Sequence, residues 1–292
     1  MITLKIPPFY GGILYFRSIV STHWLKLQNE LRAKLLTLHY QSNSGHIGGS
    51  LSCLDILIAI YFGIKKDKDV FLLSKGHSAS ALYVVLNAKG IITDEQLATY
   101  NNNGTKLPIH PAANQLDEIP FALGSLGHGL ALACGMALAD TSRNVYVLLS
   151  DGETNEGSIW EAAQFAAKQQ LSNLIVIVDK NGLQGFGDTN SVLGDTSSAE
   201  RWKSFRFNVM SCNGHDISGM VETIHQSNSS KNPIPSQIPP FVNRFPTVIL
   251  AETIKGKGVS FMENKLEWHY LPMNYDQYSK ALIEIESRKS AQ

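Results

Sequence analysis

Apolar residues near the start of the chain recur at helical spacing. Between Trp24 and about Tyr40, leucines lie at positions 25, 27, 31, 35, 36 and 38, which predicts an amphipathic helix. The turn-rich sequence SNSGHIGGS follows it, and strongly apolar segments predict two further helices, at 54–62 and 79–88. The first part of the chain is therefore expected to be mainly helical.

Two later segments, VYVLLS at 145–150 and NLIVIVD at 173–179, are apolar at successive rather than alternate positions. This pattern is typical of parallel strands that are covered on both faces. A helix through 159–167 separates them, and further strands are predicted at 70–73, 207–211 and 247–253, with helices near 199–205, 219–226 and 276–287. The alternation predicts an α/β fold with an open, mostly parallel sheet and helices on both faces.

Three segments depart from this alternation. Residues 100–120 are rich in Asn, Gly and Pro and predict a long loop. Residues 227–246 are polar and proline-rich, so we expect a surface insertion there. Residues 1–22 are interpreted as an N-terminal extension. Their apolar stretch is interrupted by Pro7, Pro8, Gly11 and Gly12, which is unlike a signal peptide. Residues 23–292 are expected to form one domain.

Composition narrows the kind of ligand. The 292 residues include 25 Lys plus Arg and 25 Asp plus Glu, so no net charge favours nucleic acid or a membrane surface. Cys53, Cys134 and Cys212 are far apart, which favours a reducing cytoplasm. No segment approaches the roughly 20 unbroken apolar residues of a membrane-spanning helix. An anionic ligand must therefore be held by a local site.

Polar residues follow directly on two of the predicted strands. Asp151 and Asn181 should converge, because ligands bind at the carboxyl ends of parallel strands. A carboxylate, an amide oxygen and the nearby Leu183 carbonyl are the oxygen ligands that magnesium prefers. The helix beginning near Glu156 would direct its N-terminus to the same place, which favours an anion. An Asp-Gly pair alone is more often a plain turn, and at a strand end we expect Asp151 at the surface.

The whole segment 150–184 resembles the thiamine-diphosphate motif of transketolases, which opens with Gly-Asp-Gly and closes with an asparagine. The resemblance implies that Asp151, Asn181 and the Leu183 carbonyl bind magnesium, and that Gly152 lets the backbone approach the diphosphate. Ser150 replaces the first glycine of the motif.

The segment GSLGHG, at 124–129, resembles the family's glycine turn, which implies that Gly124 and Leu126 contact the cofactor. His128 stands where glutamine is commoner. A dinucleotide loop is disfavoured, because the spacing is not GxGxxG. Glu156 and Glu161 either complement the helix dipole or, by the resemblance, lie at an interface between chains near the cofactor.

Four histidines also occupy family positions, in SGHIGGS, SKGHS, LPIHP and EWHY. The resemblance implies that His46, His110 and His269 act in catalysis and that His77 lies near the diphosphate. Histidine can donate or accept a proton near neutral pH, although a lone histidine is more often structural. Lys255 and Lys257 either face the anionic ligand or, in the plainer interpretation, are solvated.

The resemblance implies an enzyme that uses thiamine diphosphate and Mg2+ to transfer a two-carbon ketol unit between sugars or sugar phosphates. Complete transketolases carry a second domain that binds the aminopyrimidine ring and supplies a catalytic glutamate. We therefore expect a split enzyme of two copies of each of two chains, with the partner covering an apolar face that includes helix 159–167. The alternatives are the alpha subunit of a thiamine-dependent keto-acid dehydrogenase and a non-catalytic remnant. The sugar stays unidentified.

Overall fold

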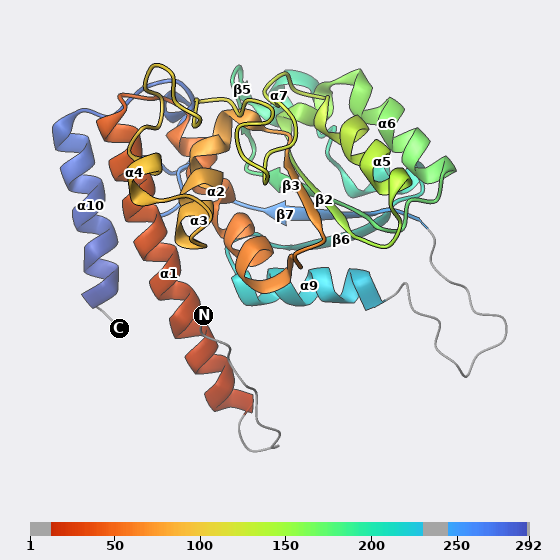
Figure 1. Cartoon of the computed structure of the whole chain (residues 1–292), viewed down its shortest axis with the longest axis horizontal. Coiled ribbons are helices and arrows are strands. Elements are labelled where there is room, and N and C mark those ends of the chain that lie inside the picture. The colour runs from red at the N-terminus through yellow and green to blue at the C-terminus, as the bar shows by residue number, and fades with distance from the viewer. Residues whose placement is uncertain (1–12, 230–244, 291–292) are drawn as a thin grey trace.

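The protein is built around a five-stranded parallel sheet. The computed structural model describes residues 13–229 and 245–290. The strands are β1 (Val70–Leu73), β2 (Val145–Ser150), β3 (Leu174–Lys180), β6 (Asn208–Asn213) and β7 (Thr247–Glu252), and their order in the sheet is β1-β2-β3-β7-β6. Every pair in this sheet is parallel, so the predicted open parallel sheet is confirmed (Figure 1).

Helices cover both faces of the sheet. They are α1 (Ile13–Gln41), α2 (Ile47–Ile58), α3 (Ala79–Ala88), α4 (Asp94–Leu97), α5 (Gly129–Ala139), α6 (Gly157–Lys168), α7 (Thr189–Leu193), α8 (Ala199–Ser204), α9 (Ile217–Ser229) and α10 (Tyr275–Ser290). A π-helical segment, Ala59–Ile64, continues α2. Short 3-10 segments lie at Gly76–Ser78, Gly152–Asn155 and Leu266–His269, and β4 (Leu183–Gln184) pairs with β5 (Gly187–Asp188) in a small hairpin.

The strands divide their side chains between two hydrophobic cores. Tyr146 and Leu148 of β2 pack with α1, α2, α3 and α9, whereas Val145, Val147 and Leu149 pack with α5 and α6. Successive side chains of a strand point to opposite faces, so a strand covered on both faces must be apolar throughout. This is why the strands could be recognised from uninterrupted apolar runs.

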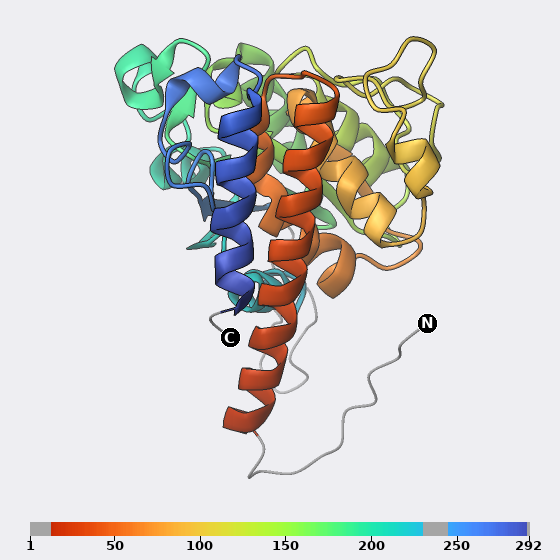
Figure 2. The same ribbon diagram turned by 90° about the vertical axis from the view of Figure 1, so that its left-hand side faces the viewer.

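The first helix begins earlier than its sequence pattern suggested. Helix α1 starts at Ile13 rather than near Trp24, so it includes part of the segment interpreted as an extension. Figure 2 shows α10 lying beside α1, and Tyr40 stacks on Tyr278 with ring centroids 4.4 Å apart. Of the expected insertion, residues 227–229 belong to α9, and residues 230–244 lie outside the described residues.

The apolar segment 47–64 is the central helix of one core. By length and composition it could cross a membrane, but 89% of it is buried inside the protein. It starts before the predicted helix at 54, because Gly48 and Gly49 lie in its first turn and allow close packing there. A Cβ on Gly48 would lie 3.1 Å from the Trp268 carbonyl oxygen. Glycine at this point thus joins α2 to the segment that carries His269.

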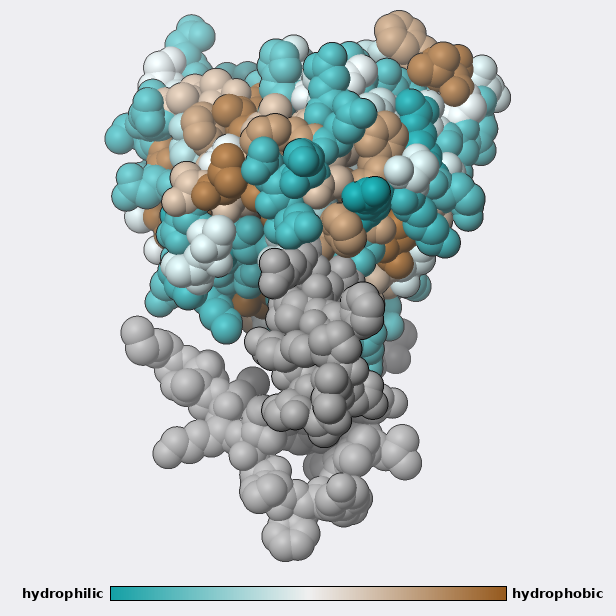
Figure 3. Space-filling view, turned by 90° about the vertical axis from the view of Figure 1, so that its right-hand side faces the viewer, coloured by the Kyte–Doolittle hydropathy of each residue, from teal (hydrophilic) through white to brown (hydrophobic). Residues whose placement is uncertain are grey.

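The outer side of α5 and α6 forms one face of the molecule. Figure 3 looks at this side, where brown apolar groups lie among teal polar ones. Leu138 and Phe165 are 47% and 42% exposed, but Ile159 and Ala163 are completely buried within this chain. The inner face of helix 159–167 packs on α5 and the sheet of this chain, so a partner can contact only its outer side, and that contact stays a prediction.

Candidate active site

A cavity of about 500 Å³ opens at the carboxyl ends of β2 and β3. The register of these strands places Ser150 level with Asp179, so the residues that follow both strands meet at one edge of the sheet. The residues to which the sequence assigned catalytic, cofactor-binding or metal-binding roles all line this cavity: His46, His77, His110, Gly124, Leu126, Asp151, Gly152, Glu156, Asn181, Leu183 and His269. The volume is in the range of small-molecule and cofactor sites.

Asp151 lies in the wall of the cavity and is only 1% exposed, so the expectation of a surface carboxylate is wrong. The turn that follows β2 folds back over it. Its two carboxylate oxygens accept hydrogen bonds from the backbone N–H groups of Gly152, at 2.8 Å, and Gly182, at 2.7 Å. Burial, reinforced by the nearby Asp179 carboxylate, raises the pKa of Asp151 to about 6. A cation at this carboxylate would offset the unfavourable burial of its charge.

Asn181 and Leu183 complete a set of oxygen donors. The Asn181 side-chain nitrogen donates to Ser52 Oγ at 3.3 Å and lies 3.5 Å from Asp179 Oδ2, so its amide orientation is fixed. Its oxygen accepts from the Leu183 N–H at 3.1 Å. Among the described residues, no three His, Cys, Asp or Glu side chains form a metal site. One carboxylate, one amide oxygen and one carbonyl are instead a magnesium-type donor set, which leaves positions for other oxygen ligands.

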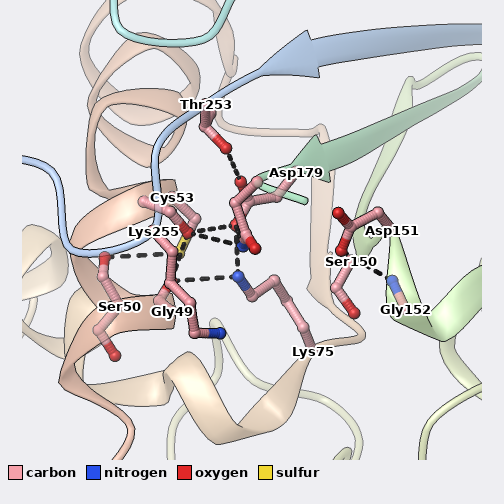
Figure 4. A network of polar contacts seen from close by, with 12 residues as sticks. Gly49, Ser50, Cys53, Lys75, Ser150, Asp151, Gly152, Asp179, Thr253 and Lys255 are labelled. Atoms are coloured by element: carbon pink, nitrogen blue, oxygen red, sulfur yellow. Dashed lines mark hydrogen bonds and ion pairs between the residues drawn. The ribbon is translucent and has the colours of Figure 1, made fainter. Parts of the chain in front are cut away.

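A buried ion pair lies beneath these donors (Figure 4). The Lys75 ammonium contacts Asp179 and also donates to the Gly49 carbonyl at 3.1 Å. Burial disfavours both charges, but Lys75 holds the pKa of Asp179 below its usual value and Asp179 holds that of Lys75 above it. Thr253 and Ser52 also donate to Asp179, which is completely buried. The pair gives the floor of the cavity a fixed charge arrangement.

Lys255 is the second buried cation of the cavity. It is 2% exposed, and its ammonium contacts the Leu183 carbonyl at 3.3 Å and His269 Nδ1 at 3.0 Å. Burial and the Lys75 charge lower the pKa of Lys255 to about 8. The solvated interpretation is therefore wrong for Lys255, whereas Lys257 is partly exposed and pairs with Glu263 at 3.7 Å.

The four histidines form one cluster. The ring of His46 lies 5.5 Å from His77, 6.0 Å from His110 and 5.3 Å from His269, measured between centroids. Burial lowers the pKa of each of them, and for His269 burial and Lys255 lower it to about 3. The rings are therefore neutral at pH 7, with one nitrogen able to donate and the other able to accept. Nδ1 of His46 is buried and, within the described part of the chain, has no hydrogen-bond partner at normal geometry.

Two glycines bring backbone close to the cavity. A Cβ on Gly124 would lie 2.8 Å from the His110 ring, and one on Gly152 would lie 2.7 Å from the Gln184 Cβ. Any larger residue would displace these neighbours. Ser150 is accommodated, since its hydroxyl accepts a hydrogen bond from the Glu153 N–H at 3.2 Å. His128 is exposed at the start of α5 and is not among the residues that line the cavity.

The mouth of the cavity is apolar and exposed. Phe186 and Leu193 are 87% and 60% exposed, and Tyr270, at 54%, donates its hydroxyl to the Gly185 carbonyl at 2.9 Å. Glu156 precedes α6 at the same mouth, and Glu161 lies on the outer side of that helix. The polar interior thus opens through an apolar rim.

Known proteins are similar to this chain in sequence and in fold. Residues 26–284 match the family described as transketolase, thiamine diphosphate binding domain. The chain is 37% identical over 278 residues to one of the subunits of apulose-4-phosphate transketolase from Phocaeicola vulgatus, covering 90% of this chain and 94% of that one. It is 36% identical over 255 residues to one of the subunits of 6-deoxy-6-sulfo-D-fructose transketolase from a Clostridium species, covering 83% and 88%.

A solved transketolase from Campylobacter jejuni has the same fold. It superposes with a TM-score of 0.77 at 27% identity, covering 90% of this chain and 43% of the transketolase chain. This chain therefore spans less than half of the solved enzyme, but nearly all of the relatives that are named as subunits. The family match over most of the chain, the shared fold and the cavity at the matching motifs lead to one conclusion: the chain belongs to the transketolase family of transferases, as its thiamine diphosphate binding section.

Proposed function

We propose that this chain binds the diphosphate of thiamine diphosphate together with magnesium, and that with a partner chain it transfers a two-carbon ketol unit between sugar phosphates. The observation that carries the proposal is the convergence on one cavity of all the residues to which the family motifs assign catalytic, cofactor-binding or metal-binding roles. When bound, the cofactor supplies the electron sink of the reaction and the metal neutralises the diphosphate. The residues of this chain would bind and orient the cofactor and exchange protons with the sugar.

The donor set supports the metal assignment. Magnesium would be bound by Asp151, the Asn181 amide oxygen and the Leu183 carbonyl. In the structure, the Lys255 ammonium contacts the Leu183 carbonyl. Lys255 and His77 line the same cavity and would face the diphosphate, with the Gly152 backbone approaching it. A lysine with no carboxylate in hydrogen-bonding contact is suited to an anionic ligand.

The histidine cluster supports the reaction type. Neutral His46, His110 and His269 surround the open part of the cavity. Ketol transfer needs groups that hold sugar hydroxyls and that take up and return protons, and a neutral imidazole can do both.

Two features support a partner. The relative matched over 94% of its length is named as a subunit, and the solved enzyme is more than twice as long as the matched part. The exposed apolar rim, with Phe186 at 87%, is suited to contact with a second chain. We infer that the partner binds the aminopyrimidine ring and supplies a glutamate, in an assembly of two copies of each chain. Free Cys53, Cys134 and Cys212 support a cytoplasmic location.

The charges in the cavity and the names of the relatives indicate which kind of sugar the enzyme would use. The relatives are named for apulose-4-phosphate and for 6-deoxy-6-sulfo-D-fructose, so we propose a sugar with an anionic end. Among the described residues the lining cations are Lys75 and Lys255, both buried at the deep end, and no arginine lines the cavity. The group that binds the far end of the sugar is therefore expected on the partner.

The test is binding of thiamine diphosphate to the purified chain with and without magnesium, by calorimetry. Asp151→Asn keeps the shape of the side chain but removes its charge, so we expect magnesium-dependent binding to be lost while the melting temperature stays at or above that of the parent. Asp188→Asn, an exposed N-cap of α7, is the matched control and should bind normally. Unchanged affinity in Asp151→Asn would rule out the metal assignment, and no binding by the parent would favour a non-catalytic remnant.

A further inference from the structure

A buried polar cluster lies next to the turn that carries Lys255 but is separate from the cavity. It consists of Arg32 of α1, Asp55 of α2 and His215, which follows β6. Asp55 is completely buried, and its Oδ2 accepts from the Arg32 guanidinium and from His215 Nδ1, the latter at 2.7 Å. None of the three is among the residues that line the cavity.

The cluster contacts the 254–257 turn at both ends. The Ile254 N–H donates to His215 Nε2 at 2.9 Å, and Arg32 Nε donates to the Lys257 carbonyl at 3.4 Å. A backbone N–H can only donate, so Nε2 of His215 must accept and Nδ1 carries the proton that is donated to Asp55. The ring is therefore fixed as one neutral tautomer, in a chain that runs from Asp55 to the backbone beside Lys255.

The turn depends on contacts of this kind, because it follows the end of β7 and leaves the sheet. Gly256 and Gly258 have φ angles of 79° and 96°, and the Gly256 N–H donates to the Gly48 carbonyl at 2.9 Å. A long, flexible lysine side chain keeps its ammonium at a fixed point only if its backbone is held. Removing a group that orients the ligand of a metal ion commonly changes affinity by about tenfold to a hundredfold, and we expect an effect at the lower end of that range for a lysine held in the same way.

We propose that His215, oriented by Asp55 and Arg32, is a positioning residue that holds the 254–257 turn so that the Lys255 ammonium faces the cavity. The role of Lys255 toward a diphosphate rests on the proposed function. The stabilisation of the turn by His215 is independent of that function.

Two measurements on the full chain distinguish the effect of His215 on the turn from the role of Lys255 in anion binding. His215→Phe fills a similar volume but removes both hydrogen bonds, and His215→Gln can still accept from Ile254 and donate to Asp55. Asp69→Ala is the matched control, because it removes a buried carboxylate that accepts from the Lys66 and Asn144 N–H groups at the opposite end of the sheet. Hydrogen exchange of the 254–258 amides reports the turn, and calorimetry with inorganic pyrophosphate and magnesium reports the anion site.

For His215→Phe we expect exchange at 254–258 to accelerate, and pyrophosphate affinity to fall, by about tenfold each. His215→Gln should restore both to within about threefold, and Asp69→Ala should leave both at the parent's values. Parent-like exchange in His215→Phe would overturn the proposal, and faster exchange with unchanged affinity would overturn the positioning of Lys255.

Two further variants, Lys255→Met and Arg32→Lys, test the two roles independently. If Lys255→Met leaves the parent's pyrophosphate affinity unchanged, or the parent binds none, the proposed function of Lys255 fails, and the exchange result still decides whether His215 holds the turn. If His215→Phe does not fold, Arg32→Lys keeps a charge beside Asp55 but removes the bond to Lys257. Its amides at 257–258 should then exchange faster, and parent-like exchange would count against the cluster.

Discussion

The cavity combines neutral histidines with buried cations at contact distance. Lys255 lies 3.0 Å from His269 Nδ1, so protonation of that ring would place two positive charges side by side. Burial, reinforced by this neighbouring charge, lowers the pKa of His269 to about 3. A bound anion would relieve the repulsion, so we expect the proton affinity of the cluster to depend on what the cavity holds.

Removing single histidines should affect turnover more than stability. In the assembled enzyme, His110→Ala and His269→Ala should each lower kcat by about a hundredfold to ten-thousandfold, the usual range for a proton-transfer group. Their melting temperatures should change little, since His110 is exposed and His269 is partly so. Steady-state kinetics with thermal unfolding checks both, and normal kcat with a large loss of stability would make these residues structural.

A buried histidine outside the cavity should contribute to the loss of stability in acid. His39 is 1% exposed and contacts Ser80 Oγ at 2.7 Å, and burial lowers its pKa from 6.5 to about 4. Between these pH values the unfolded chain binds a proton that the folded chain does not, so stability falls as the pH falls through this window. The folded state should lose about 3 kcal/mol from this group.

Chemical denaturation at several pH values measures this slope. His39→Gln cannot titrate, so its free energy of unfolding should fall less than the parent's between pH 6.5 and pH 4. His23→Gln, an exposed position on the same helix, should keep the parent's slope. Equal slopes in all three proteins would contradict the assignment.

The short SKGHS segment is held by close contact with the loop before α5. A Cβ on Gly76 would overlap the Leu123 carbonyl, whereas a Cβ on Gly135, within α5, would meet nothing within 4 Å. Gly76→Ala should therefore destabilise the chain by about 1–3 kcal/mol. Gly135→Ala should stabilise it by about 0.5–1 kcal/mol, because alanine is the better helix former. Urea unfolding of both variants checks the pair, and equal stabilities would show that the contact at Leu123 is loose.

The sequence was informative where chemistry follows a recognisable element. Asp151 and Asn181 directly follow apolar strands, and the parallel register confirmed that they converge. The buried charges were not anticipated. Lys75 and Asp179 are 104 residues apart, and His215 and Asp55 are 160 apart. A single charge in an apolar run, such as Asp179 in NLIVIVD, hints at such a pair, but only the fold identifies its partner.

Element boundaries were less predictable than element types. Helix α2 begins at Ile47, before the predicted start at 54, because tertiary packing against Trp268 outweighs the weak helix propensity of two glycines. Similarly, Ile159 and Ala163 of α6 pack within this chain, whereas Phe165 on the same helix is 42% exposed, and the apolar pattern alone did not distinguish them. Amphipathic patterns show which face is buried, and they do not show which chain buries it.

At the scale of the molecule, we expect the isolated chain to be catalytically inactive. The residues proposed to bind magnesium and the diphosphate line this cavity, so weak cofactor binding should persist, but the acid that activates the aminopyrimidine ring is expected on the partner. Ketol transfer should be assayed with thiamine diphosphate, magnesium and a panel of sugar phosphates, with and without the product of an adjacent gene. Robust turnover by the chain alone would contradict the split site.

The strand order has a consequence for how the chain is made. Strand β7 comes last along the chain but lies between β3 and β6, and β6 joins the sheet through it. During synthesis, one edge of β3 therefore has no strand to pair with until residues 247–252 have left the ribosome. Unpaired edges invite association with other chains, and parallel pairings between distant segments form slowly. Ribosome-bound chains should thus depend on chaperones until β7 is inserted and joins the two parts of the sheet.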